Sequence, residues 1–340
     1  MVFNLRQTEV LGLDIGSSTV KIIQLSKDSS GYAVIAAGII DISQDQIDKE
    51  LNTVRAIGKC LELTGVQTKF AVCSVCGTEV AVRDFEFPSL PPGEIEGAVL
   101  LEASQVCPFN IQDGRIDYQS IPKGDNKTCG VLVAATNAII KSKIQLVQEA
   151  SLDCVLMDVD GLALLNCFSA YQKPQAGQTI AILNVGSSFT TLAIMRENGL
   201  PFIRDLDYAG DDIIEQIAIE KNLESETVKK ILCSEPGTEQ IELRESLEKA
   251  CNKLIIDVTQ TSHYYKAEEK PAVVEKIFVC GGFAQVKGFV ELLNSRLPAE
   301  VVLWNPFENI RCKTGQWSRG ILESRGPAMA IAAGLAMRSI

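Results

Sequence analysis

The feature that most constrains this chain is a short glycine- and hydroxyl-rich motif that occurs twice. Residues 13–21 read Leu-Asp-Ile-Gly-Ser-Ser-Thr-Val-Lys, and residues 183–191 read Leu-Asn-Val-Gly-Ser-Ser-Phe-Thr-Thr. Each copy joins two apolar stretches, a pattern typical of two strands connected by a tight turn. The copies lie half a chain apart in 340 residues. Repetition at this spacing predicts two similar domains, each opening with a β-hairpin.

The same pattern sets the expected domain organisation. Strands and helices alternate along both halves, which predicts α/β domains, and we place the first at residues 1–174 and the second at 175–340. Within the first, a strand-helix-strand-strand block at about residues 79–153 predicts a small inserted subdomain. In the second, Ile241–Lys266 reads as one long helix. The stretch at 327–337, rich in small residues, predicts a C-terminal helix that packs back near the domain interface.

The two motifs contain the groups that bind a polyphosphate. Gly16 and Gly186 carry no Cβ, so the main chain can approach phosphate oxygens closely. Hydroxyl, backbone N–H and ammonium donors for those oxygens come from Ser17, Ser18, Ser187, Ser188 and Lys21. Asp14 cannot bind phosphate directly because like charges repel, but it can hold Mg²⁺ through water. Two such hairpins facing each other would clamp phosphates between two domains.

A third glycine-containing turn extends this hypothesis. Ile277–Cys280 reads as a strand, and Gly281, Gly282 and Phe283 follow it before a helix. Such a turn can press flat against a nucleotide base or ribose because its glycines carry no side chain. The alternative is an ordinary loop between a strand and a helix, which would be preferred for this turn in isolation. In a chain with two phosphate-type hairpins, a nucleotide-binding role is favoured.

The composition narrows the classes of partner. The chain carries 43 acidic and 32 basic side chains, and a surface with this net charge of −11 repels nucleic acid and anionic headgroups. The polar start Met1–Val10 lacks the apolar core of a signal peptide, and no segment reaches the ~20 apolar residues of a membrane span. His263 is the single histidine, which excludes multi-histidine metal sites. The scattered cysteines fit free thiols in a reducing cytosol.

The two hairpins and the Gly281-Gly282 turn resemble the phosphate and adenosine motifs of the actin, heat-shock chaperone and sugar kinase ATPase superfamily. Finer matches resemble the PilM family of type IV pilus assembly and its relative FtsA. They are Val10–Ser18, Phe87-Pro88, Cys107-Pro108-Phe109 with Glu102 in register, and Pro327–Ala336. The resemblance covers nearly the whole chain. It implies an α/β actin-like ATPase fold with two duplicated domains and a small inserted β-α-β-β subdomain, the SHS2 subdomain, in the first.

The resemblance also implies ligands, a partner and a location. The ligands are ATP and Mg²⁺, with Asp14 as the metal-positioning residue. The partner is the N-terminal cytoplasmic segment of a PilN-like inner-membrane protein, bound in a groove beside the inserted subdomain, and homo-oligomers are implied by the superfamily. The protein would be cytoplasmic and reach the inner membrane through that partner, without inserting into it. FtsA usually ends in a basic amphipathic tail, and this sequence ends at Ile340 without one, which favours PilM.

Two positions depart from the family pattern. Asn184 stands where family members usually carry aspartate, and Asp257 lies near where relatives often have glutamate. An amide can hydrogen-bond water or phosphate, but it cannot act as a carboxylate base. We therefore expect ATP binding with at most slow hydrolysis. The same module serves pilus, secretion and competence machines, and the sequence does not distinguish among them.

Two other functions stay open. A sugar or acetate kinase of the same superfamily needs a buried aspartate as base toward the substrate hydroxyl, and Asp160 is the candidate. The other role for Asp160, which we prefer, is the N-cap of a helix at 162–170. The cysteine-rich zinc motif of sugar kinases is missing from the sequence. An FtsA-like division protein is disfavoured because the amphipathic tail is missing.

Overall fold

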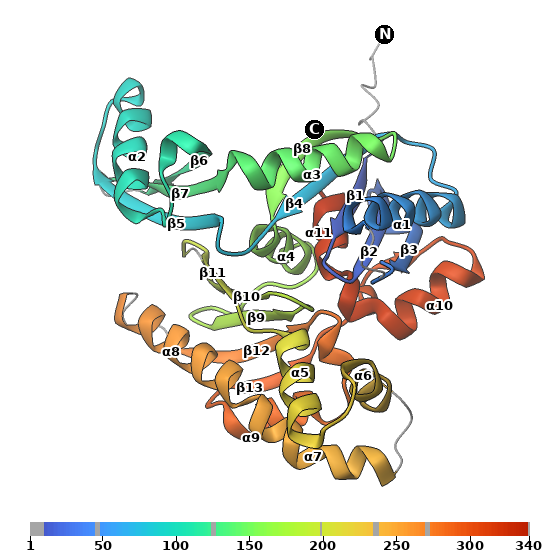
Figure 1. The fold of residues 1–340 in the computed structure, drawn as a ribbon. Helices are drawn as coiled ribbons and strands as arrows, with labels where there is room; N and C mark the ends of the chain where they lie inside the picture. Colours follow the sequence, from blue (N-terminus) through green and yellow to red (C-terminus); the bar gives the residue numbers. More distant parts are fainter. Residues whose placement is uncertain are drawn as a thin grey trace.

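The computed structural model describes residues 10–44, 48–123, 127–197, 199–233, 238–268 and 273–338. The start of the chain up to residue 9 and its end at residues 339–340, both considered above, lie outside these ranges. Figure 1 shows two β-sheets, one above the other, with helices packed around them. A third, smaller sheet lies to one side of the upper sheet.

The first sheet is formed by both early and late parts of the chain. From edge to edge its strands are β14 (Arg311–Cys312), β3 (Gly31–Asp41), β2 (Thr19–Asp28), β1 (Leu11–Ile15), β4 (Phe70–Val75) and β8 (Asp153–Val159). One face is covered by α1 (Lys49–Thr64) and α3 (Asn137–Glu149), and the other by α4 (Asp160–Ser169) and α11 (Ala330–Ala336). Gly12 in β1 allows α11 to approach, because a Cβ there would lie 2.1 Å from the carbonyl oxygen of Ala332.

The second sheet repeats the strand order of the first. Its strands are β11 (Phe202–Leu206), β10 (Thr190–Arg196), β9 (Thr179–Val185), β12 (Val274–Cys280) and β13 (Glu300–Leu303). Both sheets begin with an antiparallel hairpin, β1-β2 or β9-β10. A third antiparallel strand, β3 or β11, pairs with its second strand, and two parallel strands add beside its first strand. The order β3-β2-β1-β4-β8 therefore corresponds to β11-β10-β9-β12-β13. This topology confirms the duplicated α/β organisation predicted from the repeated motif.

Helices of the second half pack on the second sheet around one large apolar core. They are α5 (Gly210–Lys221), α6 (Ser225–Cys233), α7 (Thr238–Ala250), α8 (Asn252–Glu268) and α9 (Phe289–Arg296). The single helix predicted at Ile241–Lys266 is wrong, since α7 ends at Ala250 and α8 begins two residues later. Tyr208 explains the break, because its hydroxyl donates to the carbonyl oxygen of Ala250 at 2.7 Å. In an unbroken helix that oxygen would accept the N–H four residues ahead.

The third sheet is the small inserted unit. Its strands, in the order β5-β7-β6, are β5 (Val80–Pro88), β7 (Lys127–Thr136) and β6 (Gly114–Lys123), and α2 (Pro92–Val106) packs on it. Phe85, Val99, Ala103 and Leu132 form its buried core. The predicted strand-helix-strand-strand order is found here, whereas α3 and β8 pack with the first sheet. The limits 79–153 and the domain boundary at 174 stay predictions.

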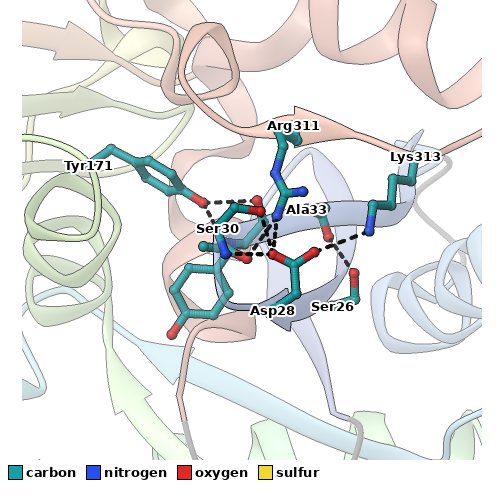
Figure 2. A network of polar contacts seen from close by, with 9 residues as sticks. Ser26, Asp28, Ser30, Ala33, Tyr171, Arg311 and Lys313 are labelled. Atoms are coloured by element: carbon teal, nitrogen blue, oxygen red, sulfur yellow. Dashed lines mark hydrogen bonds and ion pairs between the residues drawn. The ribbon is translucent and has the colours of Figure 1, made fainter.

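The end of the described chain returns from the second sheet to the first. β14 pairs in parallel with β3, and α10 (Gln316–Arg325) and the 3-10 turn Gly326–Met329 lead into α11. Figure 2 shows the ion pairs that fix this return: Asp28 binds Arg311 at 2.5 Å and Lys313 at 3.4 Å. The bond to Arg311 holds the pKa of the Asp28 carboxyl well below its usual range. Late residues thus complete the sheet that contains the first hairpin.

Candidate functional site

The two predicted phosphate hairpins have the same turn geometry and meet at their tips. The N–H of Gly16 donates to the carbonyl oxygen three residues ahead at 3.0 Å, and the N–H of Gly186 makes the equivalent bond at 3.1 Å. The hydroxyl oxygens of Ser18 and Ser187 lie 2.6 Å apart. This contact joins hairpins that are 169 residues apart in sequence.

A cavity of about 680 Å³ opens where the hairpins meet, and it lies within the range typical of small-molecule sites. It is lined by all of the residues predicted to bind nucleotide: Asp14, Gly16, Ser17, Ser18, Lys21, Asn184, Gly186, Ser187, Ser188, Gly281, Gly282 and Phe283. Asp257 and His263 lie on α8, and neither lines the cavity. The structure therefore brings the three sequence motifs together around one space.

The first hairpin presents a carboxylate and an ammonium side by side. Asp14 and Lys21 lie opposite each other across β1 and β2, so their side chains point to the same face of the sheet. The Nζ atom of Lys21 lies 2.9 Å from a carboxylate oxygen of Asp14, and both side chains are largely buried. This pair can offer a carboxylate oxygen to a hydrated cation and N–H donors to a phosphate.

The second hairpin rests on the N-terminus of α5. The first N–H groups of this helix, of Gly210 and Asp211, donate to the carbonyl oxygens of Gly186 and Ser187 at 3.0 and 2.9 Å. Burial raises the pKa of the Asp211 carboxyl, which also lines the cavity. Asn184 is buried at the base of the hairpin, and its side-chain oxygen accepts a weak hydrogen bond from the Cys280 thiol at 3.7 Å. The second hairpin is thus held by neutral partners where the first holds an ion pair.

The third motif forms a tight turn after β12. Gly281 has a positive φ of 95°, and a Cβ there would lie 2.4 Å from the carbonyl oxygen of Val185. Gly282 has no neighbour within 4 Å of an added Cβ, so it is the glycine that leaves space open beside the cavity. Phe283 is 6% exposed and packs edge-on against Phe289, so most of its ring belongs to the core of the second half.

Asp160 is not the N-cap that we preferred from sequence. The N-cap residue of α4 is Val159, and Asp160 is the first residue of the helix. Its carboxylate accepts a hydrogen bond from Ser74 at 2.5 Å and lines the cavity. Burial, together with the nearby charge of Asp14, raises the pKa of Asp160 to about 6. Both Ser74 and Asp160 lie at the carboxyl ends of parallel strands, the usual position of ligand sites in α/β sheets.

The family assignment is decided by the match over the chain as a whole. The family model of the type IV pilus assembly protein PilM matches residues 12–340. The chain belongs to the PilM family. The resemblance inferred from the hairpins, the Phe87-Pro88 segment and the C-terminal stretch is thereby confirmed.

Solved structures agree with the PilM assignment at the level of fold. The chain is similar to a chain in a structure described as the PilM-PilN type IV pilus biogenesis complex, with a TM-score of 0.83, 22% identity and 98% coverage of both chains. It is similar, at 12% identity and a TM-score of 0.56, to the ethanolamine utilization protein EutJ from Carboxydothermus hydrogenoformans, covering 99% of this chain and 92% of that one. A nucleotide-free diol dehydratase-reactivating factor shares the same TM-score at 10% identity, with coverage of 96% and 98%. The actin-like ATPase fold is confirmed.

The charges around the cavity of this PilM-family chain are balanced, although the whole chain has a net charge of −11. Among the described residues that line it, five are acidic and five are basic. The basic ones are Lys21, Lys49, Lys143, Lys229 and Arg325, of which only Lys21 was singled out from sequence. An anionic ligand therefore meets a far less negative surface here than elsewhere on the molecule.

No helix in the part of the chain that the structure describes is both long enough and apolar enough to cross a bilayer.

Proposed function

We propose that this chain is an ATP-binding scaffold of type IV pilus assembly that docks the N-terminal cytoplasmic segment of a PilN-like inner-membrane protein. The observation that carries the nucleotide part is the meeting of two equivalent hairpins, with Ser18 and Ser187 2.6 Å apart, over a cavity lined by all three glycine motifs. Membership of the PilM family supports the role in pilus assembly. The partner is inferred from the similarity to a chain of the PilM-PilN complex.

In this proposal each motif has a separate task. The backbone N–H groups and hydroxyls of both hairpins bind the phosphates, and Lys21 adds a charge-assisted bond. Gly282 leaves the space in which a base or ribose lies flat. Residues 1–174 and 175–340 act as the two halves of the clamp, a division that follows from the repeat.

The carboxylates at this site suit a magnesium ion that is bound together with the phosphates. Asp14 supplies a buried carboxylate, and Asp160 supplies a second one in the same cavity. In the described part of the chain, no group of three or more Asp, Glu, Cys or His side chains could hold a metal ion by itself. A magnesium ion here would depend on phosphate oxygens and water, as is usual beside nucleotides. Asp14 would orient that water shell.

The residues favour holding ATP over hydrolysing it quickly. Bound ATP supplies a terminal phosphoryl group that water can attack. Asn184 can orient water through its amide, but it cannot take the proton from it. Asp160 can accept a proton when it is ionised, which for a pKa of about 6 means at neutral pH and above. The Asp160 carboxylate is hydrogen-bonded to Ser74, which lies on a different strand from Asn184. We therefore infer that Asp160 does not act on the water that Asn184 orients, and we expect turnover to be slow.

Calorimetric titration of ATP into the full chain, with Mg²⁺ present, tests the nucleotide proposal. We expect saturable binding with one site per chain, and turnover on the same sample that is slow compared with ATP dissociation. Absence of saturable binding would contradict the proposal.

The inserted subdomain is the expected docking region for the membrane partner. Its helix α2 exposes Leu100 and Leu101, which are 42% and 63% accessible on the side away from the small core. A peptide with the sequence of the partner's N-terminal cytoplasmic segment should bind the full chain, and Leu101→Ser should weaken it. Leu223→Ser, which changes a 40% exposed leucine in the other half, is the matched control and should not. This docking would hold the chain at the inner membrane without insertion.

A second function is kept because Asp160 lies in the cavity. Phosphoryl transfer to a small-molecule hydroxyl would use Asp160 as base. A screen of sugars with ATP decides between the two, since phosphorylation of any sugar would favour the kinase. Membership of the PilM family favours the scaffold.

A further inference from the structure

A lysine outside the hairpins reaches the cavity from α3. One face of this helix lines the cavity through Ile139, Ser142, Lys143 and Leu146, which recur at three- and four-residue spacing. The Nζ atom of Lys143 donates to the carbonyl oxygen of Ile15 at 2.5 Å. Ile15 is the last residue of β1, immediately before the first hairpin turn. Lys143 therefore lies beside this turn, although it is 128 residues away in sequence.

The ammonium group of Lys143 has hydrogen-bonding capacity left over. A lysine ammonium has three donors, and the bond to Ile15 uses one. Lys21 differs, because the Asp14 carboxylate neutralises it at 2.9 Å. Among the ion pairs of the described residues, none involves Lys143. A half-buried cation with donors to spare at the edge of a cavity is suited to an anionic ligand.

A purely structural role for Lys143 does not account for its positive charge. Satisfying the Ile15 carbonyl requires only a neutral donor such as an amide. A lysine also brings a positive charge to a cavity whose acidic and basic side chains are equal in number among the described residues. Partial burial of an uncompensated ammonium carries a desolvation cost, which a bound polyanion would offset.

We propose that Lys143 contacts the phosphate chain of the bound nucleotide, as an additional phosphate-binding residue supplied by α3. This inference rests on the proposed nucleotide-binding function. A contact between Lys143 and the phosphates would link the bound nucleotide to the inserted sheet, because α3 begins directly after β7. Thr136, the N-cap of α3, donates from its hydroxyl to the Glu79 carboxylate at 2.6 Å just before β5. The helix proposed to contact the phosphates is thus hydrogen-bonded to the start of the inserted unit.

Three variants of the full chain test this assignment. Lys143→Gln removes the charge but can still donate to the Ile15 carbonyl, and Lys143→Arg keeps the charge. Lys141→Gln is the matched control, since Lys141 is an exposed lysine on the same helix that does not line the cavity. The measurement is the Kd for ATP and for adenosine by calorimetry with Mg²⁺, with circular dichroism spectra to verify folding.

We expect Lys143→Gln to weaken ATP binding roughly tenfold or more, as for the loss of one charge-assisted hydrogen bond, and to leave adenosine binding unchanged. Lys143→Arg should retain most of the ATP affinity, and Lys141→Gln all of it. A folded Lys143→Gln variant with wild-type affinity for ATP would overturn the proposed role of Lys143 and leave the proposed nucleotide-binding function standing. Equal weakening of ATP and adenosine would also overturn it, because the effect would not be on the phosphates. If the wild-type chain binds no ATP, the proposed function fails as well.

Discussion

The hydroxyl oxygens of Ser18 and Ser187 lie 2.6 Å apart, so the two hairpins touch at the point where the phosphates are proposed to bind. Each hydroxyl sits in a turn closed by a glycine N–H bond, and the second turn is fixed further by the N-terminus of α5. Both groups are donors as well as acceptors. The contact between the halves can therefore be exchanged for contacts to a phosphate without leaving either hydroxyl unpaired.

Removing either hydroxyl should weaken ATP binding. We expect Ser18→Ala and Ser187→Ala each to cost about 0.5–1.5 kcal/mol of binding free energy, the usual net value of one hydrogen bond. In a double-mutant cycle the two effects should not be additive, because the residues share one site. Calorimetry with ATP measures both. The control is Ser26→Ala, which removes a hydroxyl from β2 outside the cavity. If Ser18→Ala and Ser187→Ala bind ATP as tightly as this control does, the proposed phosphate binding between the two hairpins is contradicted.

The two glycines after β12 should respond differently to the same substitution. Gly281→Ala places a methyl group 2.4 Å from the Val185 carbonyl at a positive φ, and we expect it to destabilise the fold by about 2 kcal/mol or more. Gly282→Ala meets no atom within 4 Å and should unfold at the wild-type temperature. It should nevertheless weaken ATP binding if a base or ribose lies against it. Thermal unfolding and calorimetry together give the result. Unchanged ATP affinity in Gly282→Ala would remove this turn from the site.

Asp160 should make the stability of the unliganded chain depend on pH in an unusual direction. Burial raises the pKa of Asp160 from 3.8 to about 6 in the folded state, so the folded chain holds this proton more tightly than the unfolded chain. The free energy of unfolding therefore falls as the pH rises through that window. Asp160→Asn should be more stable than wild type at pH 7.5, by on the order of 2 kcal/mol, and the difference should vanish near pH 4.

Denaturant unfolding of both proteins across this pH range measures the effect of Asp160. Asp153→Asn, which changes an exposed aspartate at the start of β8, serves as the control and should show no such trend. A stability difference for Asp160→Asn that is constant from pH 4 to pH 7.5 would show that the carboxyl titrates normally in the folded chain.

Asn184→Asp should speed hydrolysis if the missing carboxylate limits it. The residue is buried at the base of the second hairpin and lines the cavity, so the change adds a base without changing side-chain size. We expect ATP turnover to rise by roughly tenfold or more, the lower range of general-base effects. A phosphate-release assay measures it. A rate equal to that of wild type would mean that Asn184 is not what slows the reaction.

The parts of the fold and site that the sequence predicts are those formed by neighbouring residues. Each hairpin is a continuous strand-turn-strand segment, and its glycine suits a tight turn, since a Cβ would lie 3.1 Å from the Thr19 carbonyl oxygen at Gly16 and 2.9 Å from that of Phe189 at Gly186. Repetition then places the two turns in equivalent positions in two equivalent sheets. For this reason the residues predicted to bind nucleotide all line one cavity.

The parts that the sequence does not predict depend on residues far apart in the chain. Lys143 reaches the first hairpin only because α3 packs on the same sheet as β1. The break between α7 and α8 is caused by the hydroxyl of Tyr208, more than forty residues earlier, at the Ala250 carbonyl. Asp160 is the first residue of its helix and not the N-cap predicted from the pattern, and its role is set by Ser74 on a neighbouring strand. The sequence signal for a role of Asp160 in the site was its position at the carboxyl end of a strand, where ligand sites of α/β sheets usually lie.

The two hairpins are proposed to hold ATP and to hydrolyse it slowly. The most direct test is to titrate the full chain with ATP in the presence of Mg²⁺ and to follow phosphate release from the same saturated sample. We expect one saturable site per chain, and release of phosphate that is slower than exchange of the bound ATP. No saturable binding, or wild-type turnover faster than ATP dissociation, would contradict it.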